Sequence, residues 1–93
     1  MLNVQLGDLV LSLLGRDKKK IFIVIDVNGD RIAVVDGKTH LIQKPKLKNV
    51  KHVKNLLSAK FTGVAEKIKS GQSVGNQRIY KLIMTEKQKI QED

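Results

Sequence analysis

The chain has no cysteine and no long apolar run, and both absences exclude whole classes of protein. Without Cys there are no disulfides, no thiolate nucleophile and no Cys-ligated zinc. No apolar stretch approaches the ~20 residues that a membrane-spanning helix needs. Residues 1–5 lack the basic region and the long apolar stretch of a signal peptide. We therefore expect a cytoplasmic protein without contact to a membrane.

The chain is also short, with 93 residues. A chain of this length forms one domain and buries roughly 65% of its unfolded surface. A multi-domain enzyme and a large cofactor cavity are excluded, so we expect neither a cofactor nor a small-molecule substrate. Apolar residues make up 41% and charged residues 29%, which is typical of a folded chain.

Acidic residues are missing from one long window. Lys and Arg outnumber Asp and Glu by 18 to 9, a net charge of +9. Residues 1–36 hold five basic and five acidic residues, whereas residues 37–60 hold seven Lys and no acid. Self-repulsion in such a window is relieved by a polyanion, of which nucleic acid is the commonest. The plainer alternative is a solvated lysine surface that binds nothing.

The first half of the chain has the pattern of short strands. Residues 9–14 are apolar and residues 21–27 are rich in β-branched side chains, as in a strand. Asn28-Gly29 predicts a type I′ hairpin turn into a return strand over 31–35.

A second such turn at Asp36-Gly37 predicts a short strand over 39–43. Pro45 then interrupts the strand pattern, because it cannot donate to a central ladder. Residues 50–56 alternate in part and predict a closing strand. Short strands with tight turns and two partly apolar faces indicate a small barrel over residues 1–58, since closure removes exposed edges.

The last third of the chain changes to a helical period. One helix is predicted to stop at Gly71, and a second to start with Asn76 as its N-cap. The apolar positions are Val64, Ala65 and Ile68 in the first helix and Ile79, Leu82, Ile83 and Ile90 in the second. We expect residues 59–93 to form a helical extension packed on the barrel.

Three stretches carry a resemblance to a known family. Residues 7–25, an apolar strand, a Gly- and Lys-rich loop and a second strand, resemble a KOW motif. The continuation through Asp36-Gly37-Lys38 and Lys44-Pro45-Lys46 is similar to the bacterial KOW-domain RNA-binding proteins. These are small proteins of Gram-positive bacteria related to a eukaryotic and archaeal large-subunit ribosomal protein. Residues 76–82 resemble the terminal helix of that family.

The resemblance implies a mainly β fold: a small SH3-like (KOW) barrel of about five strands followed by two short C-terminal helices. It also implies an RNA-binding protein that acts on ribosomal RNA or with the ribosome. Two positions depart from the pattern. Lys19 stands where the motif usually has Gly, which predicts a different turn in the loop. Leu11 and Leu13 are often polar in relatives, so we expect this face to be covered by the C-terminal helices or a partner chain.

Two basic segments are the candidate RNA-binding site. The loop after the first strand projects from a rigid scaffold, and Lys at alternate positions of an extended segment lies on one side, as suits a row of phosphates. The alternatives are an ordinary solvated loop and a charged edge that resists aggregation. The candidate residues are Arg16, Lys18, Lys19, Lys20, Lys38, Lys44, Lys46, Lys48, Lys51 and His52.

Other chemistry finds little support in the sequence. His40 and His52 make a poor zinc pair without nearby Cys, so no metal site is expected. The serines have no His and Asp companions in a shared motif, so we expect no enzyme. Asp17 is expected to shape its loop by accepting hydrogen bonds from nearby amides.

The alternative function is a protein-interaction module that docks an acidic partner. DNA binding would share the electrostatics, but the sequence shows no helix of the kind that reads a DNA groove.

Aromatic side chains make up only 3% of the chain. Binders of single-stranded nucleic acid commonly stack bases on aromatic rings. We expect Phe22, Phe61 and Tyr80 to pack in the core instead, which favours recognition of folded RNA by backbone and shape.

Overall fold

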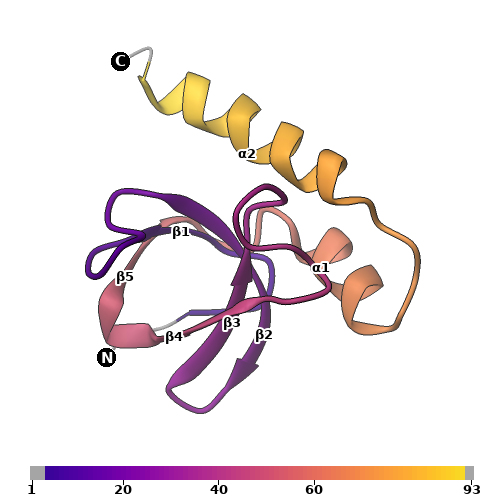
Figure 1. Cartoon of the computed structure of the whole chain (residues 1–93), viewed down its shortest axis with the longest axis horizontal. Helices are drawn as coiled ribbons and strands as arrows, with labels where there is room; N and C mark the ends of the chain where they lie inside the picture. The colour runs from indigo at the N-terminus through magenta and orange to yellow at the C-terminus, as the bar shows by residue number, and fades with distance from the viewer. Residues whose placement is uncertain (1–3, 92–93) are drawn as a thin grey trace.

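The computed structural model describes residues 4–91, so the prediction about residues 1–5 falls partly outside it. The elements are β1 (Leu9–Ser12), β2 (Ile21–Asn28), β3 (Arg31–Val35), β4 (Lys46–Asn49), the 3-10 turn η1 (Val50–His52), β5 (Val53–Leu57), α1 (Thr62–Lys69) and α2 (Asn76–Gln91). The strands form one antiparallel sheet in the order β4-β3-β2-β1-β5. The sheet curls into a barrel-like shape, with η1 joining its two edge strands (Figure 1). The predicted mainly β fold with two C-terminal helices is confirmed.

The hairpin between β2 and β3 forms where the sequence predicts it, with its turn one residue later. Asn28 pairs with Arg31, so Gly29 and Asp30 are the central residues. Only Gly29 of the two has a positive φ, at 64°. Gly at the first central position is the requirement of a type II′ turn, not of the predicted type I′.

Strand β2 is apolar on both faces because each face covers a different core. Phe22 and Val24 belong to an inner cluster enclosed by the curled sheet. Ile23 and Ile25 alternate with them and belong to an outer cluster beneath the helices. The full inner cluster is Val10, Phe22, Val24, Ile32, Val34, Val50 and Val53.

The two helices cover the outer face of the sheet. Ala65 of α1 and Ile79 and Ile83 of α2 are buried in the same cluster as Leu9 and Ile23. Helical spacing places Ile79 and Ile83 on one side of α2, which is the side that packs on the sheet. Figure 1 shows both helices on this side of the barrel.

The predicted strand over 39–43 is wrong. Residues 36–45 form an irregular loop, and the fourth strand starts only at Lys46, after Pro45. Two side chains explain the difference. The Asp36 Oδ1 atom accepts the backbone N–H groups of residues 38, 39 and 40 at 2.8–2.9 Å, and the Asn76 Oδ1 atom accepts that of Ile42 at 2.8 Å. These amides are therefore not available to a β-ladder.

Two further boundaries differ from the predictions. Residues 50–52 form a 3-10 turn rather than the start of a strand, because the Asn49 side chain accepts the N–H of Lys51. Asn76 is not the N-cap of α2: its side chain bonds the 36–45 loop, and the carbonyl of Gly75 accepts the first helical N–H groups. Gly37 permits this docking, since a Cβ there would lie 2.1 Å from the carbonyl oxygen of Asn76.

Across residues 4–91, no helix is both long enough and apolar enough to cross a lipid bilayer.

Candidate functional site

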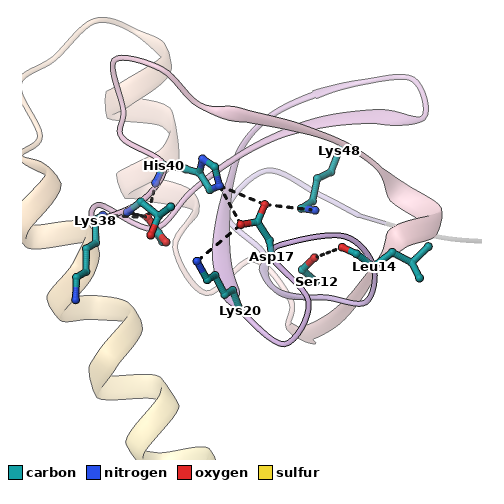
Figure 2. Close-up of polar contacts among 9 residues, drawn as sticks. Ser12, Leu14, Asp17, Lys20, Lys38, His40 and Lys48 are labelled. Carbon is teal, nitrogen blue, oxygen red and sulfur yellow. Dashed lines mark hydrogen bonds and ion pairs between the residues drawn. The ribbon is translucent and has the colours of Figure 1, made fainter.

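A buried carboxylate joins the two basic segments. Asp17 lies in the loop between β1 and β2, and it is only 7% exposed. His40 Nε2 lies 3.1 and 3.2 Å from its two oxygens, Lys48 Nζ lies 3.8 Å from Oδ2, and Lys20 Nζ lies 3.9 Å from Oδ1. Figure 2 shows these three side chains converging on Asp17 from the β1–β2 loop, the 36–45 loop and β4.

Backbone hydrogen bonds hold the β1–β2 loop in the form that buries Asp17. Ser12 and the end of the loop exchange two bonds: Ser12 N–H donates to the Lys20 carbonyl, and Lys19 N–H donates to the Ser12 carbonyl. Lys19 has a φ of 74°. The prediction of a different turn is therefore wrong, because Lys19 adopts the left-handed conformation that a glycine would take there. Its side chain and those of Arg16 and Lys18 stay exposed.

Opposing effects act on the pKa of Asp17. Burial alone raises the pKa, but the hydrogen bond with His40 and the positive charges of His40, Lys48 and Lys20 outweigh it. The net result is a pKa below the ordinary value of 3.8. Asp17 is thus held as an anion. The expectation that its carboxylate accepts nearby backbone amides is wrong, because its partners are the side chains of Lys20, His40 and Lys48.

The sheet register explains why Lys48 reaches Asp17. Lys48 pairs with Ile32, and Lys46 pairs with Val34. Opposite residues of an antiparallel pair share a side of the sheet, so both lysines lie on the side of the inner core. The Lys48 side chain is only 9% exposed and takes part in the ion pair, whereas Lys46 is exposed. The charge of Lys48 is therefore already matched by Asp17.

The other predicted site residues divide into two groups. Six exposed cations lie on the β1–β2 loop, the 36–45 loop and β4, the three segments that meet at Asp17, and form no salt bridge within residues 4–91; we call them the basic end. Lys51 and His52 are exposed on η1, and no hydrogen bond or ion pair in the described range links them with Asp17. The basic end consists of Arg16, Lys18, Lys19, Lys38, Lys44 and Lys46.

Two neighbouring hollows connect four members of the basic end. Lys19, Lys20 and Lys38 line a cleft beside α2, and Lys44 and Lys46 line a second hollow. Thr39 lines both, so the two hollows adjoin. Lys19, Lys38, Lys44 and Lys46 thus share one continuous surface across the 36–45 loop, whereas Arg16 and Lys18 line neither hollow.

Sequence reasoning missed three contributors to this site. Asp17 is the only acid between Ser12 and Ile25, and its position among four basic residues was a signal for ion pairing. His40 gave no such signal, since its position beside Phe22, with ring centroids 5.6 Å apart, depends on the irregular loop. Tyr80 is half-buried at the cleft beside α2, unlike Phe22 and Phe61, which lie in the cores as expected.

The apolar face of Leu11 and Leu13, which we expected to be covered by the C-terminal helices or a partner chain, is only partly buried. Leu11 is half-buried, but Leu13 lies beyond the strand and is 39% exposed. Neither leucine is among the hydrophobic residues described in the cluster beneath the two helices.

Chemically, the site offers fixed positive charge. Among residues 4–91, no group of three or more His, Cys, Asp or Glu side chains is placed to hold a metal ion. The surface around Asp17 is thus suited to bind an anion with several charges rather than to hold a cation.

Comparison with known proteins adds no assignment: neither a scan of protein-family models nor a search of curated proteins finds a match to this chain.

Proposed function

We propose that this protein binds structured RNA through the basic end and acts with ribosomal RNA or another part of the translation machinery in the cytoplasm. The observation that carries the proposal is that six exposed cations lie on the three segments that the buried, ion-paired Asp17 joins. Because Asp17 ties these segments to one another, their backbone loses less freedom when the cations bind a row of phosphates. Phosphate contacts of this kind position a protein on RNA without reading its bases.

The resemblance to KOW domains supports the same proposal. The β1–β2 loop joins two paired strands, and Lys19 has the left-handed conformation that the usual glycine of the motif would permit. A KOW-type barrel related to ribosomal proteins accounts for both the loop and the Lys-rich segment after β3.

Salt dependence of binding to a labelled RNA hairpin tests the proposal. Contact with about four phosphates predicts a slope of log affinity against log salt near −3. The variant Lys44→Glu/Lys46→Glu should reduce the magnitude of the slope by about 1.5 and lower the affinity more than ten-fold at low salt. Lys48 is left unchanged, because its substitution would leave Asp17 without an ion-pair partner.

The control is Lys60→Glu/Lys67→Glu, which changes exposed lysines away from the basic end. Each double variant lowers the net charge from +9 to +5, since each Lys→Glu change removes two charges. A flat salt slope, or an equal loss of affinity in both variants, would contradict the proposal.

A second candidate function is docking of an acidic protein. It is favoured by two exposed leucines that lie close in the chain to members of the basic end: Leu14 is 53% exposed and Leu47 is 62% exposed. Exposed apolar side chains beside charges are typical of protein interfaces. Binding to polyglutamate that equals binding to RNA at the same salt concentration would favour this alternative.

A further inference from the structure

The cleft between α2 and the barrel combines positive charge with the only tyrosine. It has a volume of about 310 Å³, at the lower end of the roughly 300–1,000 Å³ of small-ligand sites. Four lysines line it, from three parts of the chain: Lys19, Lys20, Lys38 and Lys87. Within residues 4–91, only Lys20 of these four takes part in a salt bridge, at 3.9 Å from Asp17.

One carboxylate, that of Asp36, also lines the cleft, and one of its oxygens is already hydrogen-bonded within the chain. Asp36 Oδ1 accepts three backbone N–H groups of its own loop. Its charge is outnumbered, because three lysines that form no salt bridge in the described range line the same cleft, so the cleft keeps an excess of positive charge. The cleft therefore favours an anionic ligand.

The wall formed by α2 presents Tyr80 and Met84 beside Lys87, so it combines a flat apolar surface with a positive charge. The two residues are four positions apart and lie on one side of the helix. Met84 is 39% exposed. A flat aromatic ring with a polarisable thioether beside it is suited to contact a flat, apolar group such as a nucleobase.

We propose that this cleft takes one unpaired base of the bound RNA, stacked on Tyr80, while Lys19, Lys38 and Lys87 contact the flanking phosphates. This inference rests on the proposed RNA binding and adds a preference for single-stranded nucleotides. It also replaces the expectation that Tyr80 is a core residue.

Lys38 currently covers the ring, with its Nζ 5.5 Å from the ring centroid. Figure 2 shows its side chain running alongside α2. An exposed cation–π contact changes an equilibrium constant by only about two- to five-fold. Stacking of a base on an aromatic side chain contributes roughly 5- to 150-fold. A base can therefore displace Lys38, whose ammonium then reaches a phosphate.

The test compares Tyr80→Leu with Tyr80→Phe, which keeps the ring. The probes are a labelled oligouridine of eight nucleotides and a labelled RNA duplex, with binding followed by anisotropy. Tyr80→Leu should bind oligouridine about ten-fold more weakly, and Tyr80→Phe should stay within about two-fold of the wild type. Both variants should bind the duplex as the wild type does, which also shows that they are folded.

A direct readout is available because the chain has one Tyr and no Trp. The fluorescence lifetime of Tyr80 should shorten when oligouridine binds and should not change with the duplex. Equal oligouridine binding by Tyr80→Leu and wild type, or an equal loss for both RNAs, would overturn the inference while RNA binding stands. A wild type that binds neither RNA would overturn the proposed function itself, and with it this inference.

Discussion

The two ends of strand β1 each hold a buried aspartate, and the two carboxylates are satisfied in different ways. Asp8, directly before the strand, is 0% exposed and accepts three hydrogen bonds from neutral groups: Gln5 N, Asn55 Nδ2 and Ala59 N, at 2.7–2.9 Å. Asp17, after the strand, has Lys20, His40 and Lys48 as its partners instead.

A strained residue, one other than glycine with a positive φ, also lies near each of these two aspartates. Within residues 4–91, the only residues other than glycine with a positive φ are Ala59, at 53°, and Lys19, at 74°. Ala59 donates its N–H to Asp8, and Lys19 lies two residues after Asp17. A strained backbone persists where its surroundings hold it. The neutral amide donors of Asp8 connect segments of this chain to one another. The cationic partners of Asp17, in contrast, place positively charged segments side by side, where an anionic ligand can bind them.

Removal of the Asp8 carboxylate should have the largest effect on stability. Asp8→Ala deletes three hydrogen bonds to a buried group and should lower the free energy of unfolding by about 3 kcal/mol. Urea denaturation followed by circular dichroism measures this loss. Asp30→Ala, at the exposed hairpin turn, is the control and should change stability little. A loss below about 1 kcal/mol for Asp8→Ala would show that these bonds do not hold the end of the barrel.

Removal of the Asp17 charge, at the other end of β1, should lower the free energy of unfolding by a smaller amount. Asp17→Asn keeps the shape of the side chain but removes its charge, so the ion pairs with Lys20 and Lys48 disappear. We expect a loss of about 1–2 kcal/mol at neutral pH. A loss as large as that of Asp8→Ala would remove the distinction between the two carboxylates.

The acid limb of the stability curve should depend on Asp17. Its pKa is lower in the folded chain than its ordinary value of 3.8, so it binds a proton more readily when unfolded. Its stabilisation is therefore fully present above pH 3.8 and is lost as the pH falls through the lowered pKa. The difference in unfolding free energy between wild type and Asp17→Asn should shrink over this range. A difference that stays constant down to the acid transition would contradict the assignment.

Relief of strain at Lys19 should have the smallest effect. Lys19→Gly should stabilise the chain by about 0.5–1 kcal/mol, because glycine adopts the left-handed conformation without steric conflict. Lys18→Gly removes the same charge at a position without a positive φ and should destabilise instead. Thermal unfolding measures both, and equal losses in the two variants would show that the loop is not strained.

Local patterns predicted much of the fold. The β-branched run of β2 and the Asn28-Gly29 signal located the hairpin, and helical spacing with Gly71 located the end of α1, because each depends on residues adjacent in the chain. The 36–45 loop was missed because its amides are accepted partly by Asn76, which lies 34 residues after Ile42. Propensity cannot detect an acceptor that only the tertiary fold brings near.

The sequence was enough to name the candidate residues, but it could not show which of them are ion-paired or lie side by side in the fold. The acid-free window correctly marks where lysines are dense. It could not show that Lys48 is paired with Asp17, since this follows from the β3–β4 register. The cleft at Tyr80 was likewise hidden, because it forms only where α2 crosses the two loops.

The RNA affinity of Asp17→Asn tests the central claim most directly. The substitution raises the net charge from +9 to +10, since it removes one negative charge, so charge alone predicts tighter binding. If Asp17 holds the basic end together, the affinity for an RNA hairpin should fall several-fold instead. The control is Asp26→Asn, which makes the same change of charge at an exposed residue paired with Lys69. An Asp17→Asn variant that is folded and binds RNA as tightly as Asp26→Asn would contradict the claim.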